Sequence, residues 1–203
     1  ENTVLAVSSP FTIGGIRLPA GRYGVHTIPT ATKWTFILSR EANNWGSFSY
    51  DPAADAARFS VTPQTADHVE WLRYTFEDPA DSSVVLTLRW EKLAVSFPVT
   101  VNTSVVVLDS LSSQLRNLPR FWSAAWVEAA RWALTNTSNL DQAEVWADTA
   151  VALSPDFTSY NLKAAILDRR GMKAQADSLR QAHLSSANEA QLNAYGYQLL
   201  SQK

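Results

Sequence analysis

The chain of 203 residues contains no cysteine. This absence excludes disulfide bonds, thiolate catalysis, iron–sulfur clusters and cysteine-based zinc sites. No apolar run approaches the roughly 20 residues that a membrane-spanning helix needs, so we predict no membrane span. Lys and Arg number 17 against 19 Asp and Glu, and neither sign forms a run. A nucleic-acid partner is therefore not expected, because such partners are recognised through clustered positive charge.

Motifs for catalysis and for metal binding are also missing from the sequence. There is no Gly-x-Ser-x-Gly that would present a nucleophilic serine, and no His-x-His or His-Glu-x-x-His that would hold a metal. Cofactor-binding motifs are absent as well. The sequence therefore predicts no catalytic residue, no metal ligand and no cofactor, and it favours a protein that is not an enzyme.

The first part of the chain, residues 1–102, has the pattern of a β domain. It holds five of the seven glycines and is rich in β-branched and aromatic residues. Gly14 and Gly15 separate two short apolar runs, as in a two-residue hairpin turn. Many short strands at this spacing are typical of an antiparallel sandwich or barrel. The strands are expected at 11–13, 16–18, 22–28, 34–39, 46–50, 57–62, 69–76, 84–90 and 95–101.

Alternation of apolar and polar residues predicts which side chains enter the core of this domain. The expected core positions fall on four of the strands. They are Trp34, Phe36 and Leu38; Leu72, Tyr74 and Phe76; Leu86, Leu88 and Trp90; and Val95, Phe97, Val99 and Val101.

The second part, residues 103–203, changes to a helical period and to Ala, Leu, Gln and Arg. Helices are expected at 105–116, 119–134, 141–153, 160–170, 173–185 and 189–200. Ala143 and Ala176 lie 33 residues apart, close to the period of tetratricopeptide repeats, in which small residues let paired helices approach. The fold prediction is therefore α+β, a β-sandwich or barrel followed by an all-α, tetratricopeptide-like segment.

His26 and several aromatic residues are the candidates for a binding site in the β domain. Alternation along 22–28 leaves His26 partly exposed, with a structural hydrogen-bonding role as the simplest explanation. Trp45 follows two asparagines in an expected loop, and flat exposed rings beside polar groups are typical of sugar or peptide platforms. The alternative is that the helical part covers these rings. The candidate ligand-binding residues are His26, Asn44, Trp45, Tyr50, Glu70, Trp71 and Arg73.

The first half also resembles a known family. The resemblance is carried by LPAGRYGVHTIP (18–29), KWTFILSREANNWGSFSYD (33–51), HVEWLRYTFED (68–78) and LRWEKLAVSFPVTV (88–101). Together these stretches resemble an uncharacterised family of exported bacterial proteins, catalogued as a domain of unknown function (number 2911), whose members often continue into tetratricopeptide-like helices. The resemblance implies export to the periplasm, the cell surface or the medium, with a signal peptide removed upstream. It implies no activity.

Two functions remain open from the sequence, and a third, a metal-dependent enzyme centred on His26, has less support because no second ligand stands at a metal-binding spacing. In the first, a non-enzymatic protein of the bacterial envelope uses its helical half to contact a protein or peptide partner, since repeat helices of this kind stack to form a binding surface. In the second, the β domain binds or processes carbohydrate through its exposed aromatic residues.

Overall fold

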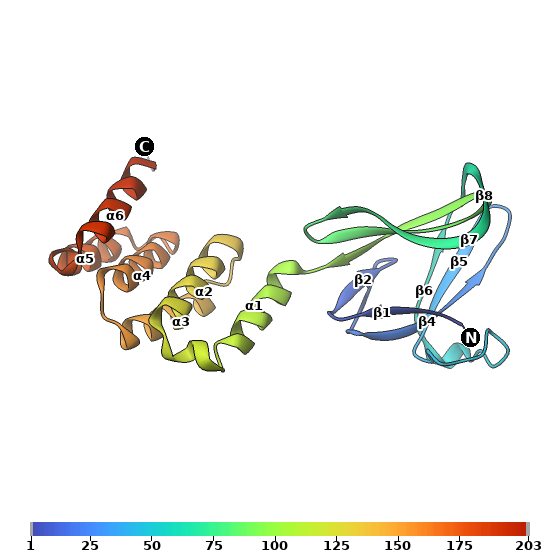
Figure 1. Ribbon diagram of the computed structural model, residues 1–203, viewed down its shortest axis with the longest axis horizontal. Coiled ribbons are helices and arrows are strands. Elements are labelled where there is room, and N and C mark those ends of the chain that lie inside the picture. Colours follow the sequence, from blue (N-terminus) through green and yellow to red (C-terminus); the bar gives the residue numbers. More distant parts are fainter. Residues whose placement is uncertain (1, 202–203) are drawn as a thin grey trace. The chain divides into compact units, whose positions relative to one another are not determined.

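The computed structural model describes residues 2–201, and the chain divides into two compact units, residues 1–106 and 107–203. The strands lie in the first unit and the helices in the second (Figure 1). The exception is the first turn of the first helix, which belongs to the first unit. This confirms the α+β class that the change of period predicts. Each unit is described by itself below.

The first unit holds two four-stranded antiparallel sheets, ordered β1-β4-β5-β6 and β3-β2-β8-β7. Their strands are β1 (Thr3–Val7), β2 (Phe11–Ile13), β3 (Ile16–Leu18), β4 (Gly21–Ile28), β5 (Trp34–Ser39), β6 (Asp55–Val61), β7 (Gln64–Ala80) and β8 (Ser83–Val101). A short 3₁₀ turn, η1 (Pro52–Ala54), precedes β6.

Strand β8 is one continuous run of extended residues that folds back on itself. The Val101 N–H donates to the Ser82 carbonyl at 2.8 Å, and the hydroxyls of Thr87 and Ser96 meet at 2.9 Å. Glu91, in the middle of the run, has a positive φ of 52°, which a tight reversal requires. The two arms of β8 therefore correspond to the separate strands expected at 84–90 and 95–101.

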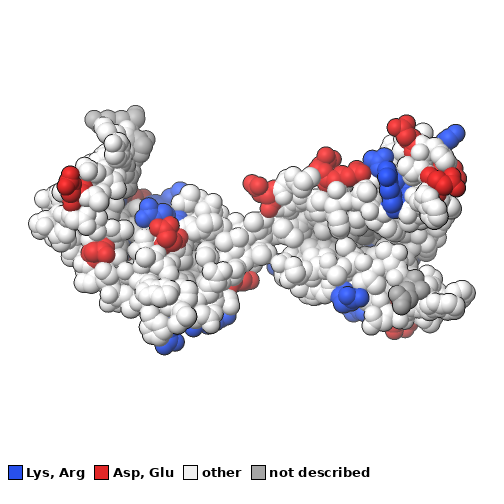
Figure 2. Space-filling view, viewed as in Figure 1, with Lys and Arg blue, Asp and Glu red and all other residues white. Residues whose placement is uncertain are grey.

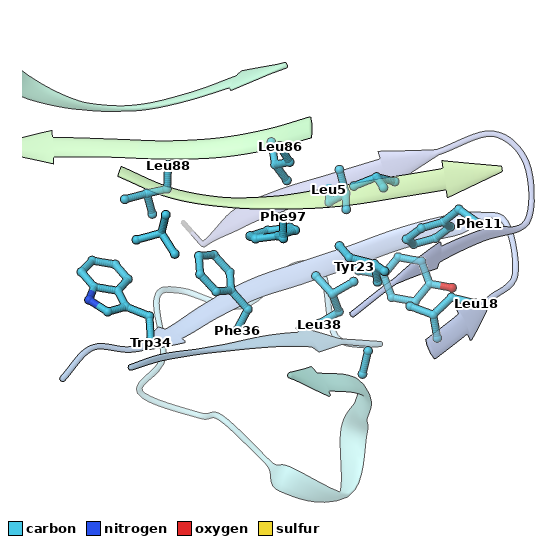
Figure 3. Close-up of a cluster of buried hydrophobic side chains, with 14 residues drawn as sticks. Leu5, Phe11, Leu18, Tyr23, Trp34, Phe36, Leu38, Leu86, Leu88 and Phe97 are labelled. Atoms are coloured by element: carbon cyan, nitrogen blue, oxygen red, sulfur yellow. The ribbon is translucent and has the colours of Figure 1, made fainter. Parts of the chain in front are cut away.

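The core lies between the two sheets, which identifies the β unit as a sandwich. Buried side chains from β1, β4, β5 and β6 meet those from β2, β3 and β8 (Figure 3). At its centre, Phe36 and Phe59 of the first sheet both contact Phe97 of the second, with ring centroids 4.7 and 5.0 Å apart. Burial of each ring stabilises the unit by about 1.5–3 kcal/mol, and their edge-to-face geometry adds to this.

Three of the expected core residues are exposed. Leu72 and Phe76 are 51% and 64% exposed, and Trp90 is 47% exposed. Leu72 and Phe76 lie on β7, an edge strand of 17 residues, whereas the strands of the facing sheet have five to eight. Part of β7 therefore has no sheet opposite it. Trp90 is exposed because it stands next to the reversal at Glu91.

Residues 46–50, expected as a strand, form turns in the structure. The Tyr50 N–H bonds back to the Ser47 carbonyl at 3.3 Å. The aromatic and small residues that suggested a strand belong to the long β5–β6 loop, residues 40–54.

The second unit is a stack of helices. Its elements are α1 (Thr103–Gln114), which begins in the first unit, η2 (Leu118–Phe121), α2 (Ser123–Asn136), α3 (Leu140–Leu153), α4 (Phe157–Arg169), α5 (Lys173–His183), η3 (Leu184–Ser186) and α6 (Glu189–Ser201). Helix α2 packs on α3, α3 on α4 and α4 on α5, and α2 also contacts α4. This succession of helix pairs agrees with the predicted tetratricopeptide-like segment.

Alanines form the contact between α2 and α3. Ala130 and Ala133 of α2, and Ala143 and Ala147 of α3, have no exposed surface. Such small side chains let two helix backbones approach closely and leave room for Trp146 in the same cluster. Asn139 and Asp156 cap the N-termini of α3 and α4 by accepting backbone N–H bonds from Gln142 and Ser159. None of the helices within residues 2–201 combines the length and the apolar character that a membrane span requires.

Substitutions of Gly14 and Gly15 can show how closely the β2–β3 turn approaches the core. Both have positive φ, but a Cβ on Gly14 would lie 2.2 Å from Cγ of Phe59, whereas nothing lies within 4 Å of a Cβ on Gly15. We expect Gly15→Ala to lower the free energy of unfolding by about 1–2 kcal/mol through backbone strain alone. Gly14→Ala adds a clash with the core and lowers it by about 1–3 kcal/mol more.

The measurement is urea unfolding of the intact chain, followed by hydrogen exchange in peptides from β2, β3 and β6. Equal effects of the two substitutions would show that Phe59 does not constrain the turn.

Candidate functional site

His26 is buried in the structure, although the strand pattern predicts a partly exposed side chain. It lies on β4 and is 6% exposed, because the β5–β6 loop covers the outer face of its sheet. Its Nδ1 is 2.8 Å from the hydroxyl of Ser47 in that loop, and its ring lies 5.2 Å from the ring of Tyr50. His26 thus connects the loop to the sheet beneath it.

The chemistry available to His26 and Ser47 is limited. A histidine that activates a serine needs a third group to orient the ring and stabilise its charged form. Within the described residues, Nε2 of His26 is buried and has no hydrogen-bond partner. No group at that nitrogen orients the ring, so the geometry suits an anchor of the loop better than a catalytic base.

Two other candidates lie in or beside the same loop. The Tyr50 hydroxyl donates to Asp55 at 2.8 Å and accepts from Nη2 of Arg58 at 2.6 Å. Burial, followed by the neighbouring Asp55 carboxylate, raises the pKa of the Tyr50 phenol. The amide of Asn44 donates to Glu41 at 2.9 Å. The contacts of Tyr50 join the loop to β6, and the Asn44 bond lies within the loop.

Trp45 stands at the surface of the loop, 76% exposed, next to Phe48, which is 91% exposed. Their ring centroids are 6.1 Å apart. The sequence predicted a platform at Trp45 but did not include Phe48, which the structure adds as a second exposed ring beside it.

The remaining three candidates are on β7, in the other sheet. Trp71 is 84% exposed, and Glu70 and Arg73 are exposed beside it. Glu70 lies 3.9 Å from His68, which also approaches Glu91 at 3.4 Å. The structure therefore brings together His26, Asn44, Trp45 and Tyr50 around one loop, and places Glu70, Trp71 and Arg73 on a different element.

The helical unit contains a hollow that the sequence did not locate. A groove with a volume of about 640 Å³ runs between α2, α4 and the start of α6. Arg131 and Leu134 line it from α2; Phe157, Thr158, Asn161, Leu162 and Ala165 line it from α4; and Asn188, Ala190, Gln191, Ala194 and Tyr195 line it from α6 and its cap. This volume is in the range of ligand-binding clefts.

Contacts within the protein fix the polar lining of this groove. Gln191 donates to the Thr158 hydroxyl at 3.0 Å and exchanges reciprocal bonds with Asn188 at the start of α6. Oδ1 of Asn161 accepts from Nε of Arg180 at 3.0 Å. Arg180 is itself nearly buried and pairs with Asp168. The amide groups of the groove are thus held in place before any ligand binds.

Sequence reasoning missed these groove residues for a definable reason. The repeat pattern identifies the alanines that face neighbouring helices, and the groove is lined by the other side of α2 and α4, where the residue types are ordinary. Thr158, Asn161 and Ala165 follow at helical spacing, which is the signal that would have indicated a common face. Within the described residues, no three His, Asp or Glu side chains gather where a metal ion would bind.

Comparison with known proteins bears on the first unit. Residues 1–99 match the model of a family described as "Protein of unknown function (DUF2911)". No curated protein and no solved structure matches the chain. The match covers the β-sandwich almost to the end of β8 and none of the helices.

The role of His26 as an anchor of the loop can be tested by hydrogen exchange. We expect His26→Leu to speed amide exchange in residues 40–50 about fivefold, because one hydrogen bond contributes about 1 kcal/mol. Ser47→Ala removes the same bond and leaves Nδ1 unsatisfied, so its effect is at least as large.

Ser49→Ala, at an exposed serine of the same loop, is the matched control and should leave exchange unchanged. Unaltered exchange in both His26→Leu and Ser47→Ala would rule out the anchoring role.

Proposed function

We propose that this chain binds an extended peptide segment of a partner protein in the groove between α2, α4 and α6. The groove lies outside residues 1–99, which match the unknown-function family. The single observation that carries the proposal is the groove itself, which has a volume of about 640 Å³ and is lined by both amide and apolar side chains. We further propose that the protein acts in the bacterial envelope. That location rests on the sequence resemblance alone.

The chemistry of the groove favours an extended peptide over other ligands. Each residue of an extended chain offers one N–H donor and one C=O acceptor, which side-chain amides such as Asn161 and Gln191 can satisfy. Between them, Phe157, Leu162 and Ala165 provide apolar surface for side chains of the ligand. Because contacts within the protein fix the amides, binding loses little side-chain entropy.

The groove proposal is tested by selecting 12-residue peptides from a random phage-displayed library on the intact chain. Ala194 is exposed and lines the groove on α6, so Ala194→Trp fills the groove without removing a core contact. We expect this change to weaken the selected peptides at least about tenfold, or 1.4 kcal/mol.

Ala152→Trp is the matched control, because Ala152 is an exposed alanine of α3 that does not line the groove. It should leave affinity unchanged. If both substitutions had the same effect, or if Ala194→Trp had none, the peptides would bind elsewhere.

A second function, carbohydrate binding by the β unit, is favoured by one observation. Trp45 and Phe48 present adjacent exposed rings at the surface of the β5–β6 loop. Flat rings of this kind bury the apolar faces of sugars, while neighbouring polar groups orient the ligand.

A glycan array checks this second function. If the ring pair binds sugar, Trp45→Ala should abolish the signal, and Trp71→Ala should not, because Trp71 is equally exposed but lies on β7. Binding that survives Trp45→Ala would remove the loop as a sugar site.

A further inference from the structure

A second groove adjoins the first. It has a volume of about 570 Å³ and lies between α1 and α2. Its lining is mainly apolar and includes Val107, Leu111 and Leu115 of α1 and the following turn, with Ala125, Ala129 and Trp132 of α2. Ligand pockets have volumes of about 300–1,000 Å³ and are lined mainly by apolar side chains, so this groove can accept a large apolar side chain.

Arg131 lines both grooves. Leu134 lies on the face of α2 that lines the first groove, toward α4 and α6. Glu128, Trp132 and Thr135, which follow at spacings of four and three residues, lie on the face of α2 that lines the second groove, toward α1. Arg131 therefore lies where the two hollows meet. A ligand that occupies both must pass this residue.

The ion pair of Arg131 with Glu128 is loose. Nε of Arg131 lies 3.8 Å from Oε1 of Glu128, which is longer than a hydrogen bond, and both side chains are more than half exposed. Such an ion pair contributes little to stability, so the carboxylate of a ligand can replace Glu128 and bind the guanidinium through two hydrogen bonds. On the face shown in Figure 2, charged residues of both signs are scattered over the helical unit. Preference for an acidic ligand would therefore come from Arg131 locally.

We propose that the two grooves form one recognition surface for an acidic peptide segment, in which a carboxylate binds Arg131 and a large apolar side chain enters the α1/α2 groove. This inference rests on the peptide-binding function proposed above, and it assigns the chemistry of the ligand. Glu128 acts as an internal competitor for the arginine.

The probe is the most enriched peptide of the phage selection, synthesised as selected and with each Asp and Glu replaced by Asn and Gln. We expect the intact protein to prefer the acidic form about fivefold at low salt, a preference that salt screens. Arg131→Gln should abolish this preference without weakening the amide form. Glu128→Gln should increase the preference about twofold, because it removes the competitor.

Binding of the large apolar side chain in the α1/α2 groove is tested at Thr135. This exposed residue lines the groove, and its hydroxyl donates to the carbonyl four residues before it. Thr135→Trp should remove the enrichment of large apolar residues in a repeated selection. Thr149→Trp is its control, because Thr149 makes the same backbone bond on α3 and lines neither groove.

The outcomes separate the two proposals. Peptides that depend on Ala194 but show no acidic preference, or keep it in Arg131→Gln, would overturn this inference and leave groove binding standing. Failure to enrich any peptide that depends on Ala194 would overturn both.

Discussion

Close approach of α2 and α3 through alanine is the constraint on which the helical unit depends. With Ala130, Ala133, Ala143 and Ala147 fully buried between the two helices, no larger side chain fits without separating them. That spacing fixes where α4 packs, because α4 contacts both α2 and α3. The groove between α2, α4 and α6 is therefore a consequence of small residues that do not line it.

The order of the elements could be predicted from the sequence because it depends on local patterns. The Gly14-Gly15 turn and the core face formed by Trp34, Phe36 and Leu38 depend on a few neighbouring residues, and the structure confirms both. Alternation also gives the correct face of β7, since Phe76 pairs with the buried Leu86. It cannot tell how far a strand extends past the sheet opposite, which is why Phe76 and Leu72 are exposed.

The candidate site depends more strongly on contacts between distant residues. His26 and Ser47 are 21 residues apart, and only the folding of the β5–β6 loop over the sheet buries the imidazole. Alternation predicts a strand with one face open to solvent, and it does not predict whether a distant loop covers that face. The groove of the helical unit likewise joins residues from α2 to α6, and no single helix shows its concavity.

The two units differ in what they offer a partner. In the β unit, the exposed aromatic residues stand on a loop surface at Trp45 and on an edge strand at Trp71, where a ligand contacts the protein from one side. In the helical unit, side chains from three helices line the groove, so a ligand bound there would remove more of its surface from water for each contact made. The alanine spacing and the fixed amides of Asn161 and Gln191 also exist before binding, which lowers the entropy lost on association. On these physical grounds the groove is the better site for specific recognition, although it lies outside the part of the chain that matches a known family.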